Sequence, residues 1–114
     1  MGNFNKKPNS KKVNFFCDWF INYQKGIVES YKDSNPDSDL LLHHLNEVKA
    51  CLSVPYRDGF KGEIEVGIGY NEDLNKLELD LYHGDDKFLI QLTQSIKSYL
   101  DNELSNDWII NIKS

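Results

Sequence analysis

Two runs in which apolar and polar residues alternate constrain the fold of this chain most. They span residues 62–70 and 76–82. Successive side chains of a β-strand point to opposite faces, so each run predicts a strand with one buried and one open face. The predicted buried face consists of Ile64, Val66, Ile68, Leu77, Leu79 and Leu81. The predicted open face carries the acids Glu63, Glu65, Glu78 and Asp80, and like charges opposite one another favour a partner that brings positive charge.

The polar stretch 71–75 between the two runs is typical of a turn. We therefore expect the runs to pair as an antiparallel hairpin over residues 63–82. Gly67 and Gly69 fall on its open face. Glycine within a strand marks either a bulge or a place where another chain approaches closely, and both interpretations stay open from the sequence.

The first predicted helix covers about residues 14–32, with Asn14 as its N-cap. Apolar and aromatic side chains recur there at spacings of three and four, which predicts one wide buried stripe. The stripe consists of Phe16, Trp19, Phe20, Tyr23, Ile27 and Tyr31. The opposite, solvent-facing side is assigned to Asn22, Gln24, Lys25 and Glu29.

Two further helices and a last strand complete the predicted order. The second helix starts with Asn35 as its cap and Pro36 in its first turn, and it ends at the loop around Pro55 and residues 58–59. Its apolar side consists of Leu41, Leu42, Leu45, Val48 and Leu52. The third helix follows residues 83–86 with Asp85 or Asp86 in its N-terminal turn, and residues 107–113 alternate again as a strand. A right-handed crossover would lay that strand parallel to residues 77–82.

These elements predict one α+β domain of order ααββαβ, with a small, mainly antiparallel sheet and helices packed on one face. Residues 1–12 are interpreted as a disordered basic leader and residues 13–114 as the domain. No apolar run approaches the about 18 residues of a membrane helix, and no secretory signal is recognisable. We therefore expect a soluble, cytoplasmic protein with two free thiols.

The charge of the chain is unevenly distributed. The formal net charge is −5, but the first twelve residues hold four lysines and no acid, so residues 13–114 carry nine cations against 18 acids, a net −9. Nucleic acids and anionic membranes are bound through cations that neutralise phosphate, so this charge argues against both as partners. It favours a protein partner with a basic surface. The alternative is that the acidity only maintains solubility.

Motifs of metal or nucleophilic chemistry are missing from the sequence. The cysteines and histidines that could bind a metal do not occur in the closely spaced pairs that zinc sites use. The neighbouring His43 and His44 point about 100° apart on a helix. These candidates are Cys17, Cys51, His43, His44 and His83. We expect no cofactor, no metal and no catalytic residue. An enzyme would have to use His83 beside Asp85 and Asp86, and a small-molecule-sized pocket containing His83 would favour that alternative.

Four segments carry a resemblance to known proteins: Phe16-Cys17-Asp18-Trp19-Phe20, Glu63-Ile64-Glu65-Val66-Gly67-Ile68, the strand that ends in His83-Gly84, and Asp107-Trp108-Ile109-Ile110. Over about residues 13–113 the chain resembles small bacterial α+β proteins of undetermined role, some of which are immunity partners of secreted toxins. The resemblance implies a fold, and it transfers no catalytic residue to this chain.

Our leading functional hypothesis is a binding protein with an acidic surface, namely an immunity protein that neutralises a basic toxin by occluding its cationic active site. The residues expected to bind this partner are Glu63, Glu65, Glu78, Asp80 and Tyr82. One alternative is a small adaptor or regulatory domain with another protein partner. The other is the enzyme that uses His83. The oligomeric state is left open.

Overall fold

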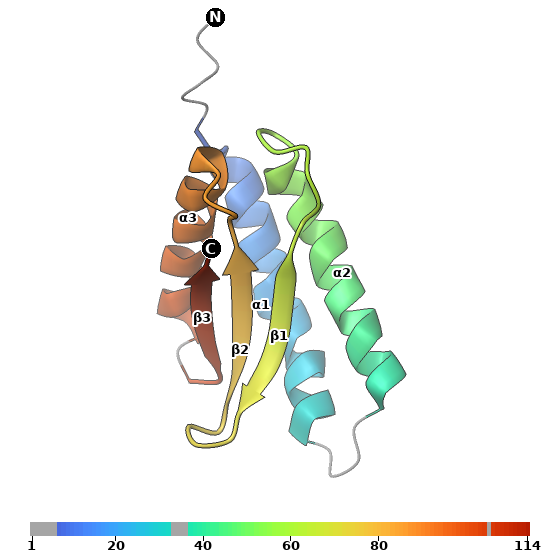
Figure 1. Cartoon of the computed structure of the whole chain (residues 1–114). Helices are drawn as coiled ribbons and strands as arrows, with labels where there is room; N and C mark the ends of the chain where they lie inside the picture. Colours follow the sequence, from blue (N-terminus) through green and yellow to red (C-terminus); the bar gives the residue numbers. More distant parts are fainter. Residues whose placement is uncertain (1–6, 33–36, 105) are drawn as a thin grey trace, which may run out of the picture.

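The computed structural model describes residues 7–32, 37–104 and 106–114. Within these residues three helices and three strands follow one another in the predicted order. They are α1 (Ser10–Lys32), α2 (Ser38–Tyr56), β1 (Val66–Asn71), β2 (Lys76–Tyr82), α3 (Lys87–Leu104) and β3 (Trp108–Lys113). All three helices lie on one face of the sheet, and no described element covers the other face (Figure 1). The molecule is therefore a two-layer α+β domain with one open sheet face.

The sheet is mixed, with strand order β1-β2-β3. β1 pairs antiparallel with β2, as the hairpin prediction requires, and β3 pairs parallel with β2. α3 connects β2 to β3 as a right-handed crossover behind the sheet (Figure 1). The parallel pairing thus follows the topology expected for a strand, helix and strand in sequence.

The core fills the space between the sheet and the helices, and α1 runs through the middle of the helical layer (Figure 1). Leu79 and Leu81 of β2 are fully buried, and so are Phe16 and Phe20 of α1. The ring of Phe20 meets the indole of Trp108 edge to face, with 5.0 Å between centroids. Val66 and Ile68 are only half-buried, because β1 is an edge strand. The predicted buried face of the hairpin is therefore confirmed, and its burial is greatest in the central strand.

Helix α1 begins four residues before the predicted cap. Asn9 caps it, since the Asn9 side-chain oxygen accepts hydrogen bonds from the backbone N–H groups of Lys11 and Lys12 at 2.9 and 3.3 Å. The prediction of Asn14 as the cap is wrong, because a better capping side chain lies upstream. Lys12, which we assigned to the leader, belongs to the helix, and its ammonium group lies 2.5 Å from the Asp58 carboxylate.

Helix α2 also starts and packs differently from the prediction. Asp37 is its N-cap and accepts a hydrogen bond from the Asp39 backbone N–H. The predicted cap Asn35 and the predicted place of Pro36 lie outside the described residues. Pro55 lies inside the last turn rather than beyond it. Val48 and Leu52 are fully buried, but Leu42 is 56% exposed. The predicted apolar side is too wide, because α2 lies at the flank of the helical layer and packs mainly against α1 (Figure 1).

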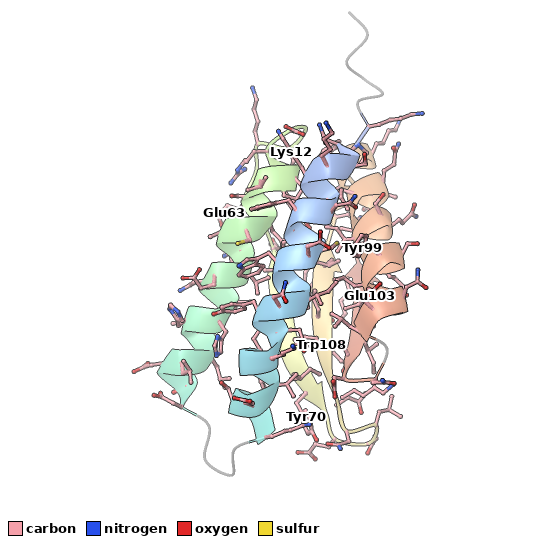
Figure 2. All side chains as sticks on the ribbon, turned by 180° about the vertical axis from the view of Figure 1, so that it is seen from behind. Lys12, Glu63, Tyr70, Tyr99, Glu103 and Trp108 are labelled. Carbon is pink, nitrogen blue, oxygen red and sulfur yellow. The ribbon has the colours of Figure 1, made fainter. Side chains whose placement is uncertain are left out.

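Gln24 is the clearest error within α1. The sequence pattern placed it on the solvent side, yet it is buried, and its side-chain oxygen accepts a hydrogen bond from the Trp108 indole N–H at 2.8 Å. A buried indole N–H needs an acceptor, and Gln24 supplies it. Figure 2 shows Trp108 behind α1, between the helical layer and the sheet.

Among the described residues, no helix combines the length and the apolar character needed to cross a membrane.

Candidate functional site: the open sheet face and its cleft

The open face of the sheet brings side chains from three strands into register. Residues that lie opposite one another on neighbouring strands form rows across this face. Starting from the C-terminal end of β2, the rows are Glu65, Tyr82 and Lys113; Gly67, Asp80 and Asn111; Gly69, Glu78 and Ile109; and Asn71 with Lys76. Glu65 precedes β1, but its backbone carbonyl still accepts a hydrogen bond from the Tyr82 N–H. Four of the five predicted binding residues therefore share this face.

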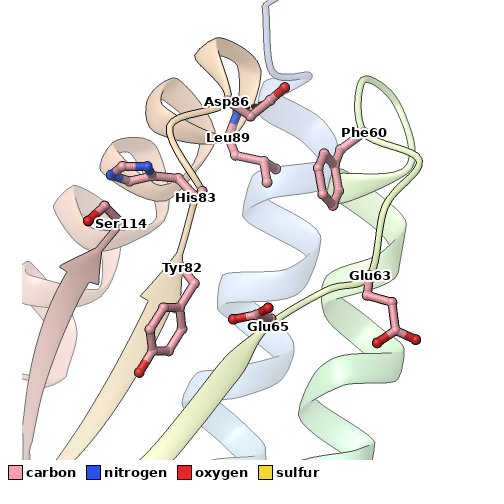
Figure 3. Close-up of a pocket in the computed structure, with 9 residues that line it drawn as sticks. Phe60, Glu63, Glu65, Tyr82, His83, Asp86, Leu89 and Ser114 are labelled. Carbon is pink, nitrogen blue, oxygen red and sulfur yellow. Dashed lines mark hydrogen bonds between the residues drawn. The ribbon is translucent and has the colours of Figure 1, made fainter.

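Glu63 does not share it. β1 begins at Val66, and the preceding chain is fixed to the end of α2, where Arg57 donates a hydrogen bond to the Gly62 carbonyl at 2.6 Å. Glu63 consequently lies at the α2 flank of the molecule (Figure 2), and its carboxylate points away from Tyr82 (Figure 3). The alternating pattern placed Glu63 in a strand that starts later in the structure.

The two central carboxylates of the open face are held by residues of β3. The Asn111 amide donates hydrogen bonds to Glu78 Oε1 at 2.7 Å and to Asp80 Oδ1 at 2.9 Å. Lys113 Nζ lies 3.4 Å from Asp80 Oδ2. The repulsion expected between the acids is thus relieved within the chain, and both carboxylates are oriented toward β3. Sequence analysis missed this role of Asn111, because only the register of the parallel ladder places it opposite Asp80.

The two strand glycines leave backbone uncovered on the β1 side of this face. The ladder between β1 and β2 is uninterrupted, with Gly67 opposite Asp80 and Gly69 opposite Glu78, so the bulge interpretation is wrong. A Cβ atom on Gly69 would have no described atom within 4 Å, and one on Gly67 would make only ordinary contact with Asp80. Packing within the described chain therefore does not require these glycines. Close approach by another chain stays a prediction.

A cleft of about 340 Å³ opens at the end of the sheet where β2 and β3 finish (Figure 3). It is lined by Phe60, Glu63, Glu65, Tyr82, His83, Gly84, Asp86, Leu89 and Ser114. Phe60 and Leu89 provide apolar surface, whereas most of the remaining lining is polar or charged. Its volume is at the small end of the range of about 300–1,000 Å³ that is typical of ligand pockets.

His83 lines this cleft, but one of its ring nitrogens is occupied. Its Nδ1 accepts a hydrogen bond from the Asp85 backbone N–H at 2.9 Å, within a turn in which Gly84 and Asp85 both adopt left-handed backbone angles. The neutral ring therefore carries its proton on Nε2 and presents a donor there. Asp86 is occupied too, because it accepts a hydrogen bond from the Leu89 N–H and caps α3. This arrangement gives His83 no free basic nitrogen.

His44 is buried between α1 and α2, where both of its ring nitrogens have hydrogen-bond partners. The Tyr23 hydroxyl donates to its Nδ1 at 2.7 Å, and its Nε2 lies 3.1 Å from the Ser30 hydroxyl, which itself donates to the Gly26 carbonyl. Burial, with a smaller contribution from His43, lowers the pKa of His44 below its ordinary value. The neutral ring is therefore favoured and is hydrogen-bonded at both nitrogens.

The cysteines and potential metal ligands do not gather into a site. Within residues 7–32, 37–104 and 106–114, no three His, Cys, Asp or Glu side chains are grouped so as to hold a metal ion. Cys17 and Cys51 are both free thiols. Burial, with a smaller effect of Asp18, raises the pKa of Cys17 to about 12, so this thiol is not a reactive thiolate at neutral pH.

The chain matches no protein-family model, no curated protein and no solved structure. The functional argument therefore depends on the geometry of the open face and of the cleft.

Proposed function

We propose that the chain is a non-catalytic binding protein whose open sheet face binds a partner with a basic surface. The observation that carries this proposal is the geometry of Glu78 and Asp80, which Asn111 holds in fixed orientations on an uncovered sheet face. Oriented carboxylates lose little side-chain freedom on binding, so pairing with cations costs less. The glycines of β1 allow the partner to approach the backbone beside them.

Within this class we propose an immunity protein that acts in the cytoplasm and occludes the cationic active site of a toxin. The net charge of −9 over residues 13–114 supports an electrostatically attracted partner. Charge complementarity raises association rates to as much as about 10⁸–10⁹ M⁻¹s⁻¹, which suits capture of a toxin before it causes damage. A regulatory adaptor with another basic partner would use the same surface.

The test begins with capture of a partner from the native host and its identification by mass spectrometry. Association is then measured at low and moderate salt for the wild type and for Glu65→Lys/Glu78→Lys. We expect association at low salt to slow by about tenfold or more and the salt dependence to flatten. The matched control is Glu29→Lys/Glu103→Lys, which changes the net charge equally at exposed positions of the helical layer. Equal slowing in both double variants would show that net charge, and not this face, governs binding.

The cleft favours a second candidate, an enzyme, because acid–base chemistry at His83 would need a small-molecule-sized pocket that contains this residue. The bond from Asp85 N–H to His83 Nδ1 speaks against acid–base catalysis, since it occupies the nitrogen that a general base would need. Nitrogen chemical shifts of the His83 ring test this point. A neutral ring held as the Nε2–H tautomer supports the binding protein, whereas exchange between the two neutral tautomers favours the enzyme.

A further inference from the structure

We infer that the cleft beside Tyr82 receives the guanidinium group of an arginine side chain that the partner protein presents. This inference rests on the proposed function, and it assigns one specific contact within the larger basic surface. The contact would lie at the end of the open face, between the end of β2 and the segment that precedes β1 (Figure 3).

The free negative charge of this face is concentrated at the cleft. Glu78 and Asp80, in the middle of the sheet, are already paired with Asn111 and Lys113. By contrast, Glu65 makes no side-chain hydrogen bond or ion pair with any described residue, and the same holds for the hydroxyl of Tyr82. The cleft therefore offers a cationic group acceptors without any partner in the described chain, whereas Glu78 and Asp80 offer it carboxylates that Asn111 already orients.

The non-polar lining of the cleft matches the rest of an arginine side chain. Phe60, which is only partly buried, offers apolar surface to its aliphatic stem, and the ring of Tyr82 offers an aromatic face near the Glu65 carboxylate (Figure 3). A planar guanidinium stacks on aromatic rings and pairs with a carboxylate through two parallel hydrogen bonds. A lysine ammonium is a more strongly hydrated point charge and uses such a surface less well.

An anionic ligand is disfavoured in the same cleft. The N-terminus of α3 borders it and would attract anions, but the Asp86 carboxylate already accepts the Leu89 N–H there. Lys113, the cation in the same row as Glu65 and Tyr82, extends to Asp80 in the adjacent row instead. The groups left free are therefore acceptors for a cation, together with the donor at His83 Nε2.

The first experiment titrates the full chain with N-acetyl-arginine N-methylamide and follows its backbone amides by NMR. The matched probe is N-acetyl-citrulline N-methylamide, which has nearly the same shape without the charge. We expect amide shifts at Glu65, Tyr82, His83 and Gly84, and affinity for the citrulline probe lower by about tenfold. Equal binding of both probes, no binding, or shifts centred on Asp80 would overturn the inference.

The second experiment separates the cleft from the rest of the acidic face. Glu65→Gln should weaken binding of the arginine probe by about tenfold, because it removes the unpaired carboxylate. Glu78→Gln, a matched change at a carboxylate that Asn111 already engages, should leave it unchanged. Glu65 is exposed, so its substitution is compatible with folding. Equal loss in both variants contradicts the inference.

Free L-arginine distinguishes a partner side chain from a small molecule. It carries an α-ammonium and an α-carboxylate in place of the two amides, and these opposite charges largely offset one another beside Glu65, so we expect it to bind no more tightly than the capped residue. Tighter binding of free arginine would overturn the inference in favour of a metabolite. Failure of the arginine probe while Glu65→Lys/Glu78→Lys still slows partner association would refute the cleft contact alone. Probe binding without any effect of that double variant on partner association would refute the proposed function, because the cleft would then bind arginine without serving the partner.

Discussion

The two faces of strand β2 differ in chemistry and in how their side chains are held. On the helical side, Leu79 and Leu81 are fully buried in the core. On the open side, Glu78 and Asp80 are held by the Asn111 amide, and Asp80 also by Lys113. Apolar burial is non-directional, whereas hydrogen bonds depend on distance and angle. The buried face therefore determines whether the chain folds, and the open face can vary in charge while the fold persists, as a binding surface requires.

The largest expected effect tests this contrast directly. Leu79→Ala should reduce the free energy of unfolding by about 2–5 kcal/mol, because it removes a fully buried side chain and leaves a cavity. Asp80→Ala, its neighbour in the same strand, should cost about 1 kcal/mol or less, because its ion pair with Lys113 is partly exposed. Chemical denaturation of both variants provides the comparison. Similar losses in the two variants would mean that the open face is part of the core.

A smaller effect should come from the amide that organises the open face. Asn111→Ala should lower the free energy of unfolding by about 1 kcal/mol, since Glu78 and Asp80 lose their shared donor. Asn111→Asp should lower the free energy of unfolding by more, because it places three carboxylates next to one another. Added salt should reduce this loss, because it screens their repulsion. Denaturation at low and moderate salt measures both effects, with Asn102→Ala, at an exposed position of α3, as the control.

Charge removal sharpens the same test. Glu78→Gln combined with Asn111→Asp should recover most of the stability lost in Asn111→Asp, because the amide and the carboxylate exchange places. An Asn111→Asp variant as stable as the wild type at low salt would contradict the hydrogen-bonded cluster.

Much of the fold could be predicted because it depends on periodicity. Alternation identified which side of each strand is buried, and the spacing of apolar residues identified all three helices. Helix ends were less predictable, since Asn9 and Asn14 are both acceptable caps by residue type and only their backbone geometry differs. The prediction that Gln24 faces solvent was wrong for another reason. Its burial is a response to the Trp108 indole, 84 positions away in the sequence, and no local pattern contains that contact.

The candidate site was predictable only in part, for a related reason. The acids of β2 and the aromatic Tyr82 followed from alternation, but their pairing with Asn111 and Lys113 depends on a parallel register set by a crossover helix. The cleft combines side chains from several separate segments, so neither its apolar lining nor the occupied nitrogen of His83 could be deduced from spacing. Hydrogen bonds and ion pairs between distant segments determine how the site is arranged, and the periodicity of the sequence does not encode them.

The smallest expected effect is a pH dependence that comes from the helical layer and not from the open face. The fold lowers the pKa of His44, whose ordinary value is 6.5, chiefly by burial. Below about pH 6.5 the unfolded chain therefore takes up this proton first, so protonation favours unfolding. The contribution of His44 to stability is complete above pH 6.5 and is lost as the pH falls through the lowered pKa of the folded state.

Unfolding free energies measured from pH 7.5 to 5.5 should decline less steeply in His44→Gln than in the wild type. His43→Gln, at the exposed neighbouring position, removes only the smaller contribution to the lowered pKa of His44, so it should flatten the slope less than His44→Gln does. An unchanged slope in His44→Gln would show that the burial of His44 does not carry the pH dependence of stability in this range.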